Sequence, residues 1–195
     1  MKPLSLILAF LPLVAFSLLA RVLPAGDFGV AAIVAAAVAA LALVTSRPVW
    51  PPKIITGLSL VLFLVLAVIG FAVRADDSWL ATWGGAGVGV VLGLIIVALV
   101  PVMPFTEQFA RESTPRQYWG SPTFTLINRV LSTAWGAAII ALGASRVVAA
   151  VIKQPPAGPL IVQLLFSLFI PLAILIYMLK FSKSYPERVT RQDAA

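Results

Sequence analysis

The residues IITGLSLVLFLVLAVIGFAV, at positions 54–73, indicate the fold class because they form an apolar run of 20 residues without a charge. A helix of about 20 apolar residues is long enough to cross the hydrocarbon core of a bilayer. On both sides of this run, similar apolar stretches alternate with short turns that contain proline, glycine and charged residues. We therefore predict an all-α polytopic membrane protein, a bundle of transmembrane helices.

The pattern predicts six membrane spans within one membrane domain, residues 1–195. They cover residues 4–23, 28–45, 54–73, 80–103, 122–145 and 157–179, and leave a loop at 104–121 and a basic tail at 180–195. The first run resembles a signal peptide, but it is longer than the apolar core of about 7–15 residues that signal peptides carry. We interpret it as a retained helix. Its cleavage would leave five spans in the same orientation.

The composition agrees with a lipid environment. Hydrophobic residues make up 61% of the chain and charged residues 11%, against about 25% charged in soluble domains. The net charge of +7 can indicate a nucleic-acid partner. In a membrane protein, however, basic loops set the topology and meet anionic headgroups. We expect the lipid bilayer as partner and no nucleic acid.

The distribution of cations predicts the orientation of the six spans. Ten of the 14 Lys and Arg residues fall on one side of the membrane, the side that also carries both termini and the 104–121 loop. Because positively charged loops stay in the cytoplasm, we predict that both termini are cytoplasmic. The ten residues are Lys2, Arg47, Lys53, Arg111, Arg116, Arg129, Lys180, Lys183, Arg188 and Arg191.

The residue types that most catalytic sites need are missing. The chain has no cysteine and no histidine, which excludes thiol nucleophiles, Ser–His–acid triads and histidine zinc sites. The centres of the predicted spans hold no carboxylate, which argues against a proton- or sodium-coupled pump. We expect no enzymatic activity, no catalytic residue, no cofactor and no metal site.

A stripe of glycines marks one face of the fourth predicted span. Gly85, Gly89 and Gly93 recur every four residues, and Gly136 follows Ser132 at the same spacing in the fifth span. Small residues at this spacing let two helix backbones approach closely in a membrane. The stripe predicts a contact with a neighbouring helix, in this chain or in a second copy. The Ala-rich second span is a plausible partner within the chain.

The 104–121 loop and the start of the fifth span hold most of the candidate functional residues. Thr106 is positioned to cap a short helix that Pro115 ends, and Glu107 and Arg111 are spaced to form an ion pair on it. Ser121 and Pro122 predict the start of the fifth helix. The candidate ligand or partner residues in this region are Glu107, Arg111, Glu112, Trp119, Asn128, Arg129, Ser132 and Trp135.

Arg129 stands out because the apolar run after it, 130–145, is too short to cross a bilayer core of about 30 Å. Its guanidinium must therefore reach the headgroups or find a partner. The sequence leaves open an ion pair with Glu107, an ion pair with Glu112, or a contact with lipid. In the sixth span, Gln163 and Ser167 form a polar face with Pro171, which frees the carbonyl of Ser167 for another donor.

The layout resembles the bacterial intracellular septation protein A family. The resemblance is carried by FLPL at 10–13, the Ala-rich second span, the charged turn and tryptophan at 74–83, and Trp119, Asn128 and Trp135. It implies a multi-pass protein of the bacterial cytoplasmic (inner) membrane, linked to cell division and envelope maintenance and without known enzymatic activity. Envelope or division proteins would then be its partners, and a homo-oligomer is compatible with the glycine stripe.

Two functions are compatible with these observations. The first is a non-enzymatic scaffold or interaction protein of the cell envelope, which fits the missing catalytic residues and the 104–121 loop. The second is a small transporter or lipid-handling protein. It would use the polar faces of the fifth and sixth spans, lined by Asn128, Arg129, Ser132, Gln163 and Ser167.

Overall fold

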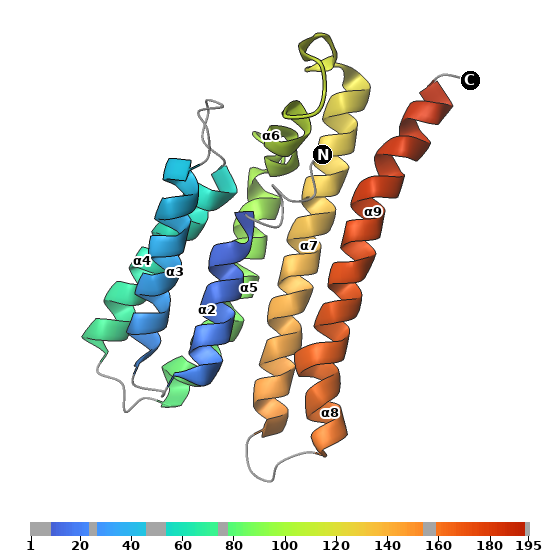
Figure 1. Cartoon of the computed structure of the whole chain (residues 1–195). Coiled ribbons are helices and arrows are strands. Elements are labelled where there is room, and N and C mark those ends of the chain that lie inside the picture. Colours follow the sequence, from blue (N-terminus) through green and yellow to red (C-terminus); the bar gives the residue numbers. More distant parts are fainter. Residues whose placement is uncertain (1–8, 24–26, 46–53, 74–77, 154–158, 194–195) are drawn as a thin grey trace. The chain divides into compact units, whose positions relative to one another are not determined.

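The computed structural model describes residues 9–23, 27–45, 54–73, 78–153 and 159–193, and every regular element in these ranges is a helix (Figure 1). The all-α class is therefore confirmed. The residues group into two compact units, one covering Pro3–Val88 and one that begins at Gly89. The boundary falls within helix α5 (Ser78–Leu99), and the two units are described separately below.

Three helices are long and apolar enough to cross a membrane, judged by length and composition. They are α3 (Phe28–Thr45), α4 (Ile54–Ala72) and most of α7 (Pro122–Lys153). Shorter apolar segments lie in α2 (Leu11–Val22) and at Gly87–Leu99 in α5. The bounds of α3 and α4 agree with the second and third predicted spans. Residues 4–8 of the first predicted span lie outside the described residues.

Three phenylalanines form the centre of the N-terminal unit. Phe16 on α2 packs edge-to-face against Phe28 on α3, with ring centroids 5.4 Å apart, and lies 5.1 Å from the ring of Phe63 on α4. All three side chains are almost fully buried. Burial of large apolar side chains, together with favourable ring geometry, holds α2, α3 and α4 together.

Helices α3 and α4 pack closely because small residues line their contact. A Cβ atom added to Gly70 on α4 would lie 2.7 Å from the backbone N and Cα of Gly29 on α3. Ala32 and Ala36 of the Ala-rich helix α3 are also buried. The Ala-rich helix therefore packs against α4, and its small side chains allow that approach.

The glycine stripe of α5 contacts α7 in the same chain, so the suggestion that the Ala-rich second span is its partner was wrong. A Cβ atom on Gly89 would lie 3.0 Å from the Cα of Gly143, and one on Gly93 would lie 2.8 Å from the carbonyl oxygen of Gly136. The glycines of the two helices face each other, and only glycine leaves room for this separation. The surroundings of Gly85 lie outside the described part of the chain.

Two long helical rods run side by side in the C-terminal unit (Figure 1). One is α7, and the other is the continuous run of α8 (Leu160–Leu164), the π-helix η3 (Leu165–Phe169) and α9 (Ile170–Asp193). At about 1.5 Å per residue each rod is about 50 Å long, more than the hydrocarbon core of about 30 Å. Both rods are therefore longer than that layer is thick.

The ends of the predicted fifth and sixth spans needed correction. The fifth span was predicted to end at residue 145, but α7 continues to Lys153. The sixth was predicted to end at residue 179, but α9 continues through the basic tail to Asp193. Tyr177, Phe181 and Tyr185 stack along α9 at four-residue spacing, with ring centroids 6.0 and 5.2 Å apart. Such contacts within one helix stabilise it where the chain becomes polar.

The π-helix η3 has a local cause in Pro171. The amide of Ile170 donates to the carbonyl of Leu165, five residues back, and in that register the next carbonyl, of Phe166, would need the amide of residue 171. Proline has no amide hydrogen. The hydroxyl of Ser145 on α7 donates to the Phe166 carbonyl instead, at 2.5 Å. The sequence predicted that the carbonyl of Ser167 would be free for another donor. In the structure the carbonyl that receives such a donor is that of the preceding residue, Phe166.

Candidate functional site

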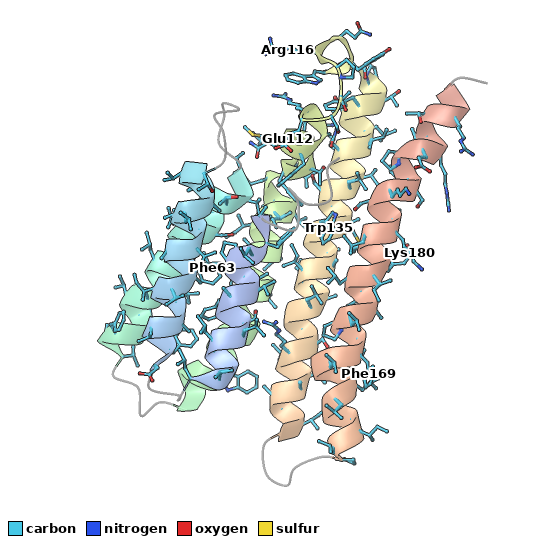
Figure 2. The ribbon with its side chains drawn as sticks, in the orientation of Figure 1. Phe63, Glu112, Arg116, Trp135, Phe169 and Lys180 are labelled. Atoms are coloured by element: carbon cyan, nitrogen blue, oxygen red, sulfur yellow. The ribbon has the colours of Figure 1, made fainter. Side chains whose placement is uncertain are left out.

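Most of the predicted functional residues gather at one end of the C-terminal unit. This end, called the polar end here, comprises residues 104–131 and 180–193: helix α6 (Phe105–Arg111), the loop that contains the 3-10 helix η2 (Arg116–Tyr118), the start of α7 and the last part of α9. It carries seven cations and four acids. In Figure 2, Glu112 lies at the end of α6 and Arg116 on the loop beyond it.

Helix α6 is fixed to α7 by buried hydrogen bonds of Thr106. Its hydroxyl donates to the carbonyl of Asn128 at 2.9 Å, and its amide donates to the hydroxyl of Ser132 at 3.2 Å. The two hydroxyl oxygens also lie 2.9 Å apart. Because the Thr106 hydroxyl already donates to a carbonyl, Ser132 donates to Thr106. Both side chains are fully buried.

The prediction that Thr106 caps α6 was wrong. The residue that precedes the helix is Pro104, without a side-chain cap, and Thr106 lies within the first turn. Its neighbour Phe105 packs edge-to-face on Phe109, and both are buried. The apolar face of α6 is therefore turned inward, which places Thr106 against the polar face of α7. A threonine hydroxyl can cap a helix or bond to another helix, so the sequence alone did not distinguish the two roles.

The loop after α6 is organised around Trp119. Two guanidinium groups lie over its ring, with the Cζ atom of Arg111 5.0 Å and that of Arg116 5.8 Å from the ring centroid. Its indole N–H donates to the carbonyl of Thr114 at 2.9 Å. Arg111 also forms the predicted ion pair with Glu107, which is confirmed. Each cation–π contact is worth about 0.5–1 kcal/mol at exposed sites, so the loop has a defined shape.

Arg129 does not form the ion pair with Glu107 that the sequence left open. The carboxylate of Glu107 is bonded to Arg111, one turn further along the same helix. Arg129 is exposed on α7, and the described residues show no ion pair between it and an acid. Glu112 is half-buried at the end of α6. Of the alternatives considered for Arg129, an exposed contact with headgroups fits its position best.

Asn128 is the most unusual polar residue of the site. Its side chain is 1% exposed, and its amide nitrogen Nδ2 donates to the carbonyl of Phe124 at 2.8 Å. That bond fixes the amide orientation, because a carbonyl can only accept. The side-chain oxygen Oδ1 is buried and has no hydrogen-bond partner among the residues that the structure describes. A buried acceptor without a donor typically costs about 1–3 kcal/mol.

A cavity of about 530 Å³ adjoins Asn128. Its walls come from α6 (Ala110), the following loop (Tyr118 and Ser121), α7 (Phe124 and Asn128) and α9 (Pro186 and Thr190). This volume is in the range of small-molecule pockets, about 300–1,000 Å³. Tyr118 is 52% exposed, so the wall that it forms reaches the surface.

The remaining predicted residues lie along the contact between α7 and α9. Trp135 is buried, and its indole N–H donates to the hydroxyl of Ser182 on α9 at 2.8 Å (Figure 2). Gln163 lies in α8 and Ser167 in η3, and their side chains lie outside the description. The structure therefore unites Asn128, Ser132 and the loop residues, while Trp135 fixes α9.

Several important residues were not singled out from the sequence. Ser182 and Ser145 hold α9 and η3 to α7, and Pro186 and Thr190 complete the cavity wall. A signal existed for α9, because Tyr177, Phe181 and Tyr185 are spaced for one helix face. The serines gave no such signal, because the position of a serine in the sequence does not show which helix its hydroxyl will bond to.

No protein-family model, curated protein or solved structure matches the chain. Within the ranges that the structure describes, no group of three or more His, Cys, Asp or Glu residues could hold a metal. The polar end, with its fixed α6 and its cavity, is therefore the best guide to function.

Proposed function

We propose that the chain is a non-enzymatic, multi-pass protein of the bacterial cytoplasmic membrane, with six spans and both termini in the cytoplasm. The large apolar side chains that remain exposed on its helices support contact with lipid. On α8, η3 and α9 they follow one another from Leu160 to Leu179, and Lys180 comes directly after. A change from exposed apolar to charged residues is expected where a helix leaves the bilayer.

We further propose that it is an interaction scaffold of the cell envelope, and that the polar end is the surface its partner binds. The observation that carries this proposal is the Thr106–Asn128–Ser132 bonding, which fixes α6 and the Trp119 loop on a long helix. A surface held in one conformation loses little conformational entropy when it binds a partner. Its excess of three positive charges favours an acidic protein surface.

Photo-crosslinking in cells tests the scaffold. A photoreactive amino acid replaces Gln117, which is exposed next to Arg116 on η2, or Val151, which is 55% exposed near the other end of α7. We expect a discrete product with another protein from position 117, lost in the Arg116→Glu variant, and no such product from position 151. Crosslinks to lipid alone, or a product that charge reversal leaves unchanged, would count against the scaffold.

The cavity favours lipid handling as the second candidate function. Asn128, one of the five residues expected to line a pathway, lies in its wall, whereas Ser132 is buried beneath Thr106. Reconstitution in liposomes with fluorescent lipid or solute separates the two candidates. Transfer by the wild-type chain that falls in a cavity-filling variant would favour lipid handling over the scaffold.

A further inference from the structure

We propose that one face of α9 is a binding site for an anionic phospholipid. The phosphate of the lipid lies between Lys180 and Lys183, and its acyl chains lie along the apolar residues that precede these lysines on the same face. The inference rests on the proposed function in one respect, since α9 must cross the membrane with its charged end on the cytoplasmic side. It adds a lipid class and a place on the chain.

The apolar half of the site is an exposed face of α9. Leu172 is 48% exposed and Ile176 is 45% exposed, and Lys180 is exposed as well. Because these residues follow one another at four-residue spacing, they lie on one face of the helix. Figure 2 shows Phe169 and Lys180 on the side of α9 that faces away from α7. An acyl chain along this face therefore has a lysine at its charged end.

The charged half of the site is the pair of Lys180 and Lys183. Both side chains are exposed, and in the part of the chain that the structure describes neither forms an ion pair. Residues three apart on a helix have Cβ atoms about 5–6 Å apart, so both ammonium groups can reach one phosphate. A phosphatidylglycerol headgroup carries a net negative charge, whereas the choline of phosphatidylcholine cancels the charge of its phosphate. The pair therefore favours anionic over zwitterionic lipid.

Two sets of contacts hold the lysine pair in place. Ser182, which lies between the two lysines in the sequence, accepts a hydrogen bond from the indole N–H of Trp135 on α7 at 2.8 Å. The ring of Phe181 stacks on those of Tyr177 and Tyr185, with centroids 6.0 and 5.2 Å apart. The turn that carries the lysines is therefore ordered without a lipid. A site held in one conformation loses little conformational entropy on binding.

A second pair of cations on α9 provides an internal control. Arg188 and Arg191 are exposed and are also three residues apart, but they lie eight residues beyond the lysines. At about 1.5 Å per residue they are about 12 Å further from the apolar face, more than the screening length of about 8 Å at physiological ionic strength. Glu187 lies between the two pairs and acts on both. The arginines therefore add little to lipid binding at the lysines, although they carry the same charge.

Photolabelling of the full chain in lipid nanodiscs tests the site. The probes are phosphatidylglycerol and phosphatidylcholine, each with a photoreactive group in an acyl chain and each at a trace level in neutral carrier lipid. Mass spectrometry maps the labelled residues. At low salt we expect phosphatidylglycerol to label residues 172–179 about tenfold more efficiently than phosphatidylcholine, because each cation near the surface contributes up to about fivefold. High salt should reduce this preference, since exposed charges are screened.

Two double variants remove the same charge from different levels of α9. Lys180→Gln combined with Lys183→Gln should abolish the preference for phosphatidylglycerol, and Arg188→Gln combined with Arg191→Gln should keep it. All four side chains are exposed, so neither variant removes a buried contact. Equal labelling by the two lipids in the wild type, or an equal loss in the two double variants, would overturn the site and leave the topology intact.

Two further outcomes separate the site from its premises. Labelling of residues 172–179 by neither lipid would overturn the membrane placement of α9 together with the site. Inorganic phosphate should displace the anionic probe no more than chloride does at the same ionic strength. A larger effect of phosphate would mean that the lysines bind a phosphate group alone and not a lipid. The scaffold proposal is tested independently, by the crosslink from position 117.

Discussion

Thr106 shows how one side chain can organise a membrane protein's polar end. It lies on a helix of seven residues, α6, which is too short to be stable alone in water. Its three contacts with Asn128 and Ser132 connect that short helix to a helix of 32 residues. Because the three residues are buried, each of these groups would otherwise remain unsatisfied.

Replacing Thr106 by valine tests this contact. The substitution keeps the shape and removes the hydroxyl, so the Asn128 carbonyl loses that donor and Ser132 loses its acceptor. We expect a loss of about 1–3 kcal/mol in the free energy of unfolding. Thermal or denaturant unfolding in detergent measures it. Because Ser132→Ala acts on the same contact, the double variant should lose less than the sum of the two single losses.

Thr133→Val is the matched control for Thr106→Val. Thr133 is exposed, and its hydroxyl donates to the carbonyl of Arg129 in its own helix at 2.9 Å. We expect a change within about 0.5 kcal/mol, as is usual for surface positions. Equal losses at both threonines, or additive losses for Thr106 and Ser132, would show that the buried contact contributes nothing particular.

At the scale of elements, the glycines of α5 and α7 determine how closely these helices pack. The backbones of the two helices occupy the space that side chains would fill at any residue larger than glycine. Gly143 of α7 belongs to this contact as well as Gly136, although the sequence analysis singled out only Gly136. Gly143 follows Gly136 by seven residues, which places both on one helix face. With its partner glycines found on α7, the stripe no longer argues for a second copy of the chain.

Gly89→Leu should disturb this packing strongly. The added side chain would meet the backbone of Gly143, and overpacking of this kind commonly costs about 1–3 kcal/mol or more. Expression level and melting temperature in detergent report the effect. Val91 is 46% exposed and lies off the stripe, so Val91→Leu should change neither measurement noticeably. Similar tolerance at both positions would indicate that the stripe faces lipid.

At the scale of the whole molecule, the proposed topology places residues 78 and 184 on opposite sides of the membrane. The chain has no native cysteine, so single cysteines can be introduced without background. In intact cells, Ser78→Cys should react with an impermeant maleimide, and Ser184→Cys should react only after lysis. The reverse pattern would invalidate the cytoplasmic placement of the polar end.

The sequence predicted the helices better than their contacts. Apolar length placed α3 and α4 within about a residue, and Ser121 with Pro122 predicted the start of α7, where the Phe124 amide donates to the Ser121 hydroxyl at 3.2 Å. The sequence did not predict that α7 extends to Lys153 or that α9 extends to Asp193. Both helices continue through segments with charged residues, because packed side chains stabilise a helix there as well. The function of Thr106 and the partner of the glycine stripe depend on residues distant in sequence, which no local pattern reveals.

The exchange of hydrogen bonds at the π-helix has an evolutionary consequence. Ser145 is useful because Pro171 cannot supply an amide to the Phe166 carbonyl, and Pro171 is tolerated because Ser145 supplies the donor. A lineage that lost the serine alone would carry an unsatisfied carbonyl inside the helix, whereas one that lost the proline alone would free the serine to vary. Descendants of this chain should therefore lose the proline first, or replace both residues together, and rarely lose the serine alone.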